Sequence, residues 1–140
     1  MLLINGIQKE IYSQLANSGS DNIKKLQGIF NSPPVNTKFP YLTIAIENMD
    51  IEKNCNGYDN YLLNSTIKIF DRNETNGGVI AIADDVMKEL SGLVNINVDN
   101  FLIIDLINME TNFEVFHDIT SVWNCVLKFT IIIKRIRDES

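Results

Sequence analysis

The amino-acid sequence predicts an α+β fold, a mainly antiparallel β-sheet with two α-helices packed on one face. Two segments repeat apolar residues at the three- and four-residue spacing of an amphipathic helix, and three others alternate apolar with polar residues as half-buried strands do. The order is helix, strands, helix, strands, with short connections that favour hairpins. A length of 140 residues suits one domain, so residues 1–140 are expected to share a single core.

The first element is a predicted helix over residues 2–16. Its apolar residues form one stripe, and polar residues such as Lys9, Glu10 and Gln14 lie on the other side. The stripe consists of Leu3, Ile4, Ile7, Ile11 and Leu15. The helix is expected to end in the segment ANSGSDN, whose Asn, Ser and Gly residues compete for helical hydrogen bonds or release them.

The stretch KFPYLTIAIEN, residues 38–48, predicts the start of a strand. Pro40 has a fixed φ and lacks an N–H, and it pushes Phe39 into extended geometry, so the pair marks the beginning of a strand. From there Leu42, Ile44 and Ile46 point to one face. Residues 58–70 repeat this alternation, with Leu63, Ser65, Ile67 and Ile69 on one face, and the segment between the two strands is expected to be a hairpin loop.

The second helix is predicted from Val79, where the apolar period changes to that of a helix, and it should close at Gly92. Its stripe consists of Val79, Ile82, Ala83, Val86 and Leu90. Residues 101–110 then predict another strand. The final strand, SVWNCVLKFTIIIK, exceeds the usual strand length of about five or six residues, so it is expected to be central or to project. Its apolar face consists of Trp123, Cys125, Leu127, Phe129, Ile131 and Ile133.

Composition and charge exclude several classes of function. The net charge of −6 argues against a protein that grips DNA, because that affinity comes from clustered Lys and Arg, but it suits a surface past which DNA must slide. Residues 1–15 lack the basic region of a signal peptide, and Lys9 and Glu10 interrupt their apolar residues early, so we expect neither a signal peptide nor a membrane span there. Cys55 and Cys125 are far apart and without a metal-binding pattern, so we expect a reducing compartment, no metal and no cofactor.

The candidate catalytic residues are few, and the sequence predicts a protein that is not an enzyme. His117 is the only histidine, and no nucleophile with a recognisable context accompanies it, so a solvent-exposed loop histidine is the simpler interpretation. A hydrolase would rest only on His117 with nearby acidic residues. The acidic residues Asp71, Glu74, Asp84 and Asp85 fit the capping of a helix and its dipole better than a divalent-ion site.

Aromatic residues in predicted loops are the candidate interface. Tyr58 and Tyr61 flank the first hairpin, while Phe113 and Phe116 lie in a polar segment before the final strand. Exposed aromatics commonly anchor protein interfaces, although packing against the sheet ends of their own subunit fits the sequence equally well. A basic cluster near the C-terminus offers a second contact patch or a solvated terminus. This cluster consists of Lys134, Arg135 and Arg137.

The N-terminal amphipathic helix and four further segments resemble the tail-completion or tail-terminator proteins of long-tailed phages, prophages and gene-transfer particles. FPYLTI at 39–44 resembles the family's Phe-Pro-Tyr strand start, and IKIFDR at 67–72 resembles its strand running into a polar turn. IAIADDVMKEL at 80–90 resembles its Ala-Asp-containing helix, and VWNCVLKFTI at 122–131 its last strand. Only the Phe-Pro-Tyr motif has some specificity, and the loop TNFEVFHDIT departs from the pattern.

The resemblance implies a non-enzymatic structural subunit of the virion, made in the bacterial cytoplasm and placed at the junction of tail and neck. Such subunits assemble into a ring, typically a hexamer, that caps the tail-tube protein and meets the head connector while DNA passes through without specific binding. A different class of function also fits the loop aromatics: a small soluble adaptor that acts as a monomer or dimer on one protein partner. The number of subunits in solution separates the two.

Overall fold

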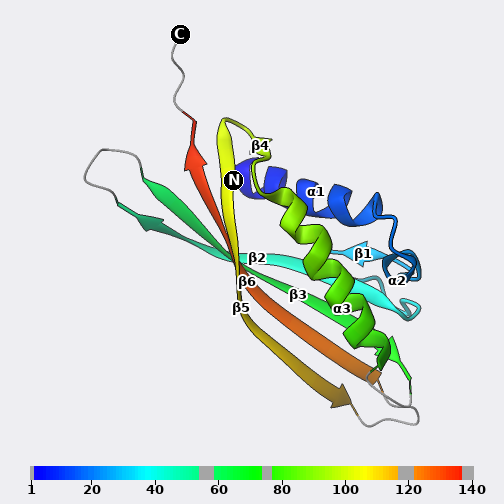
Figure 1. Ribbon diagram of the computed structural model, residues 1–140. Coiled ribbons are helices and arrows are strands. Elements are labelled where there is room, and N and C mark those ends of the chain that lie inside the picture. Colours follow the sequence, from blue (N-terminus) through cyan, green and yellow to red (C-terminus); the bar gives the residue numbers. More distant parts are fainter. Residues whose placement is uncertain (1, 54–58, 74–76, 117–121, 137–140) are drawn as a thin grey trace.

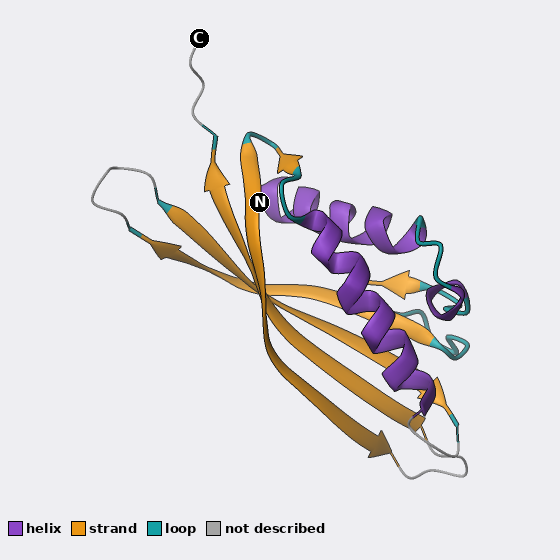
Figure 2. Ribbon diagram, in the orientation of Figure 1, coloured by secondary structure: helices purple, strands orange, loops and turns teal. Residues whose placement is uncertain are grey.

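The protein is built on one β-sheet that carries its helices (Figures 1 and 2). The computed structural model describes residues 2–53, 59–73, 77–116 and 122–136. The helices are α1 (Leu2–Ala16), α2 (Asp21–Lys24), α3 (Gly77–Leu90) and a 3-10 turn, η1 (Ser91–Leu93). The strands are β1 (Ile29–Phe30), β2 (Tyr41–Glu52), β3 (Asn60–Arg72), β4 (Asn97–Val98), β5 (Phe101–Phe116) and β6 (Val122–Arg135).

The sheet has the strand order β1-β2-β3-β6-β5-β4 within the described ranges. Every pairing is antiparallel except that between β1 and β2, where Ile29 and Phe30 run parallel to Leu42 and Thr43. The α+β class is therefore confirmed, with a sheet that is mixed because of this short edge strand. The strands also curl strongly across one another, as Figure 1 shows.

The final strand lies in the middle of the sheet, as its length predicts. β6 pairs with β3 on one side and with β5 on the other. Its residues Cys125, Leu127, Phe129, Ile131 and Ile133 are all buried, which confirms the predicted apolar face. The exception is the side chain of Trp123, which is only partly buried and packs at the margin of the core.

The core lies between this face of the sheet and the two long helices. α1 and α3 lie on the same side of the sheet in Figure 1, α3 contacts β3 and β6, and α1 contacts α3 and β2. Both predicted stripes are buried, apart from the partly exposed Ile4, because an amphipathic helix gains stability by burying its apolar side. The most deeply buried helical side chains are Ile7, Ile11, Leu15, Val86 and Leu90.

The segment after α1 contains a helix that the sequence analysis did not predict. Ser20 caps the four-residue helix α2, its Oγ accepting a hydrogen bond from the Ile23 N–H at 3.4 Å. Ser20 Oγ also donates to Asp85 Oδ2 at 2.5 Å, and Ser18 Oγ donates to Glu89 Oε1 at 2.8 Å. The polar residues that end α1 therefore tie it to α3 through side-chain hydrogen bonds.

β5 is longer than predicted, and this corrects the interpretation of residues 111–116 as a loop. These residues pair in register with Leu127 to Val122 of β6, up to the pair Phe116 and Val122. β5 has two register irregularities, between Ile103 and Asp105 and between Asn108 and Glu110, but none from Glu110 onward. An edge strand needs no buried face to be extended, which explains why its polar sequence gave no strand signal.

Candidate functional site

The described residues offer no constellation of catalytic or metal-binding groups. No three histidine, cysteine or carboxylate side chains among them gather closely enough to hold a metal ion. His117 and Glu74 lie outside the described residues. Asp85 is engaged by neighbouring residues: its Oδ2 accepts hydrogen bonds from Ser20 and from Asn22 Nδ2 at 2.9 Å, which together hold the pKa of Asp85 below its ordinary value.

The buried thiol of Cys125 is not a nucleophile at neutral pH. Burial, with a smaller contribution from the negative charge of Asp84, raises the pKa of Cys125 to about 11. The thiolate is the reactive form, so this thiol is inert at physiological pH.

Among the described residues, no helix is both long and apolar enough to cross a bilayer.

Three residues of the predicted interface, Tyr61, Lys134 and Arg135, lie in strands. Tyr61 belongs to β3 and is partly buried, with its ring edge-on to Phe101 at 5.6 Å between centroids. The guanidinium of Arg135 lies over the Phe101 ring, 5.6 Å from its centroid. Lys134 is exposed near the end of β6. Tyr58 and Arg137 lie outside the described residues.

Phe113 is the exposed ring among the predicted interface aromatics whose side chains the structure describes. Its side chain is 42% exposed, in a strand and not in a loop. The register pairs it with Cys125, so it lies on the face of the sheet that carries the helices. Its neighbours from Glu110 to Glu114 are also exposed, and only the backbone of Phe116 is described. Exposed aromatic rings are the kind of side chain that commonly anchors protein interfaces.

Aromatic rings from three strands form a cluster at the start of β2, which the sequence did not predict. Tyr41 stacks on Phe70 of β3 with ring centroids 4.8 Å apart, and it contacts Phe39 at 5.4 Å and Phe30 at 6.4 Å. Arg72 covers the Phe39 ring at 5.0 Å. The Phe-Pro-Tyr motif thus closes one end of the sheet, because each ring is partly buried by the others.

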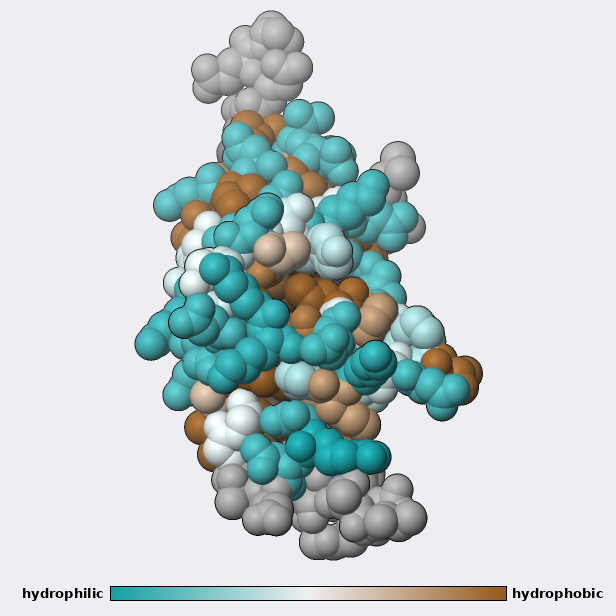
Figure 3. Space-filling model, turned by 90° about the vertical axis from the view of Figure 1, so that its right-hand side faces the viewer, coloured by the Kyte–Doolittle hydropathy of each residue, from teal (hydrophilic) through white to brown (hydrophobic). Residues whose placement is uncertain are grey.

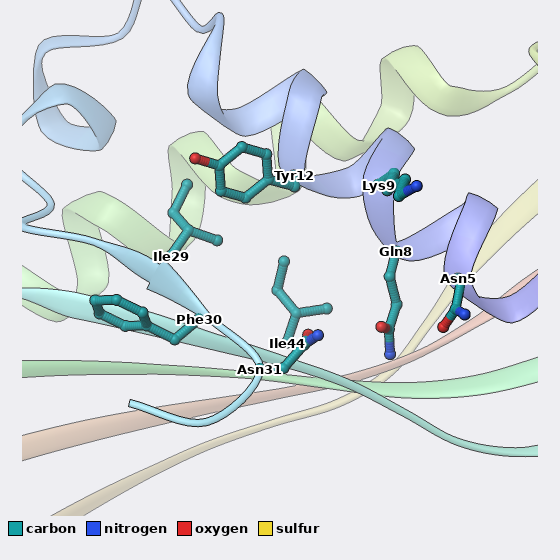
Figure 4. A pocket seen from close by; sticks show the side chains of 8 residues that line it. All are labelled: Asn5, Gln8, Lys9, Tyr12, Ile29, Phe30, Asn31 and Ile44. Atoms are coloured by element: carbon teal, nitrogen blue, oxygen red, sulfur yellow. The ribbon is translucent and has the colours of Figure 1, made fainter. Parts of the chain in front are cut away.

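A cleft lies between α1 and the β1 edge of the sheet. Figure 4 shows side chains of α1 facing those of β1 and β2 across it. Its volume is about 280 Å³, with Ile29 and Ile44 as apolar lining and Lys9 among the polar residues. A second hollow of about 300 Å³ adjoins it, sharing Tyr12 and Ile29 and adding Lys24. Figure 3 views the molecule from the side of α2 and β1 and shows recessed apolar residues surrounded by hydrophilic ones.

The comparisons with known proteins support the fold. No protein-family model matches the sequence, and no curated protein matches it. Among solved structures, a chain of the "Virion of native gene transfer agent (GTA) particle" matches with a TM-score of 0.78 and 13% sequence identity. The match covers 94% of this chain and 97% of that chain. The two chains therefore share one fold over nearly their whole lengths.

Proposed function

We propose that this protein is a non-enzymatic structural component of a phage or a phage-like particle. The observation that carries the proposal is the full-length fold match to a chain of a gene transfer agent virion. The match covers 94% of this chain and 97% of that chain, so the fold of the virion chain is shared over almost all of the sequence. The finer role, which the resemblance of FPYLTI and its neighbouring segments supports, is that of a tail terminator.

In this role the subunits form a ring, a hexamer in the simplest case, that caps the tail tube and helps join the tail to the head connector. The site of action is the junction of tail and neck. A net charge of −6 suits a ring through which DNA passes without being held, because an acidic surface repels phosphates. Exposed Phe113 and the aromatic cluster around Tyr41 are the surfaces offered to neighbouring proteins.

The experiment that tests this role is deletion of the gene in the bacterium that carries it, followed by electron microscopy of the induced lysate. A terminator that is lost should leave unattached heads and tails of uneven length, and a plasmid copy should restore joined particles. Joined particles with tails of normal length in the deletion strain would contradict the proposal. A lysate in which only the tail fibres or the heads are altered would contradict it as well.

A further inference from the structure

We propose that the β5 edge of one copy docks against the α1–β1 edge of the next copy, with Phe113 entering the cleft beside Tyr12. The proposal rests on the ring-forming role and names the surfaces that would join its subunits. It commits to a second copy of this chain as the occupant of the cleft. Three features of the described residues carry it: the position of the two edges, the position of Phe113, and the charges on either side.

The two edges lie at opposite ends of one sheet. β4 pairs with β5 only at Phe101 and Leu102, so within the described residues no strand flanks Glu110–Phe116 on that side. This stretch pairs regularly with β6, and its side chains from Glu110 to Glu114 are exposed. This edge stretch is regular from Glu110 onward, carries an exposed phenylalanine and contains neither lysine nor proline; its two carboxylates, Glu110 and Glu114, disfavour contact with a like edge but not with a basic one.

Phe113 and the cleft lie in the same layer of the molecule. Phe113 points to the face of the sheet that carries the helices, because it pairs with buried Cys125. The cleft lies on this same face, between α1 and the strands β1 and β2. When one sheet edge is placed beside the opposite edge of the next copy, the two layers continue, and Phe113 comes beneath the neighbouring α1. Tyr12, which is 51% exposed, then meets an aromatic partner.

The charges of the two edges are complementary. Residues 101–116 of β5 contain three acidic side chains, Asp105, Glu110 and Glu114, and no basic one. Residues 22–46, which include β1 and the start of β2, contain three lysines and no acidic side chain. The two adjoining hollows are lined by Lys9 and Lys24, again without a carboxylate. Complementary potentials of this kind favour the contact between unlike edges over the contact between two β5 edges.

A contact between unlike surfaces has a consequence for assembly. Each copy keeps one free β5 edge and one free cleft after the first contact, so further copies add head to tail. Growth stops only when rotation brings the last edge to the first cleft, which closes a ring. This is the symmetry that a cap on a tail tube requires.

Two variants with opposite defects test the inference. The edge variant carries Phe113→Ser and Glu114→Lys, and the cleft variant carries Lys9→Glu and Lys24→Glu. All four side chains are exposed, so both variants should fold, which circular dichroism checks. The matched controls are Ile107→Ser, a residue of β5 that is 46% exposed, and Lys88→Glu, an exposed residue of α3 that lines neither hollow.

Light scattering on each protein alone and on the mixture gives the outcome. The wild-type protein and both controls should form large species, and each variant alone should have the monomer mass of 15.9 kDa. An equimolar mixture should give a dimer, because one intact edge meets one intact cleft and no second contact can form. A wild-type protein that stays monomeric up to the highest soluble concentration, or a mixture that stays monomeric, would overturn the inference.

The failure of this inference is distinguishable from failure of the proposed function. If the variants still form the wild-type species, the β5 edge and the cleft are not the surfaces that join the subunits. The gene-deletion phenotype would still test the role in the tail independently. Restoration of large species by Glu114→Lys combined with Lys9→Glu and Lys24→Glu in one chain would support pairing of these charges directly. If the triple variant forms no large species, pairing of these charges is not what joins the subunits.

Discussion

Truncation of Phe129 to alanine should destabilise the protein far more than the same change at Phe113. Phe129 lies on central strand β6 with its side chain 1% exposed, in the layer between the sheet and the helices. Phe→Ala substitutions in a core cost about 3–5 kcal/mol, since they lose the transfer free energy and leave a cavity. The Phe113 side chain is 42% exposed and is not enclosed in the core, so its truncation should change the free energy of unfolding by no more than about 0.5 kcal/mol.

Urea unfolding followed by circular dichroism measures both effects. For a small domain with an m-value of about 2 kcal/mol/M, Phe129→Ala should lower the unfolding midpoint by about 2 M and Phe113→Ala by less than about 0.3 M. The protein concentration is kept low and equal, because assembly would add stability. A midpoint shift below about 0.5 M for Phe129→Ala, or equal shifts for the two variants, would refute the assignment of these residues to core and surface.

Three further predictions concern polar and titratable groups. The hydrogen bonds that lower the pKa of Asp85 stabilise the fold above its unfolded pKa of about 4, and this stability is lost as pH falls through the lower folded value. Asp85→Asn should therefore flatten the acid limb of the unfolding free energy against pH; an unchanged limb would contradict the role. Ser18→Ala should cost about 1 kcal/mol in urea unfolding by removing the bond to Glu89, whereas no loss would contradict that contact. In a Cys55→Ser background, Cys125 should react with iodoacetamide at pH 8 only after urea is added, and rapid labelling of the folded protein would contradict its burial.

The elements with strong periodicity could be predicted from the sequence. The stripe of α1 and the alternation of β6 are long enough to identify their elements, and the helix bounds 2–16 agree with the structure. Pro40 places the beginning of β2 at Tyr41, as expected from the lack of an N–H at proline. These signals are local, so they need no knowledge of which strands meet.

The features that escaped the sequence depend on contacts between distant residues. The segment TNFEVF is too short and too polar to show a clear alternation, and its pairing with β6 makes it a strand. α2 has four residues, too few for a periodic pattern, and exists because Ser20 caps it and bonds Asp85. The aromatic cluster joins Phe30, Tyr41 and Phe70, which the registers of β1, β2 and β3 bring together.

Ring assembly by this chain is decided by the solution mass of the purified protein over a concentration series, with negative-stain imaging of any large species. We expect a closed ring of uniform size, about six subunits of 15.9 kDa each, that falls apart in the edge variant. Monomers or dimers at every concentration would contradict ring assembly by this chain alone and would favour an adaptor that acts on one protein partner.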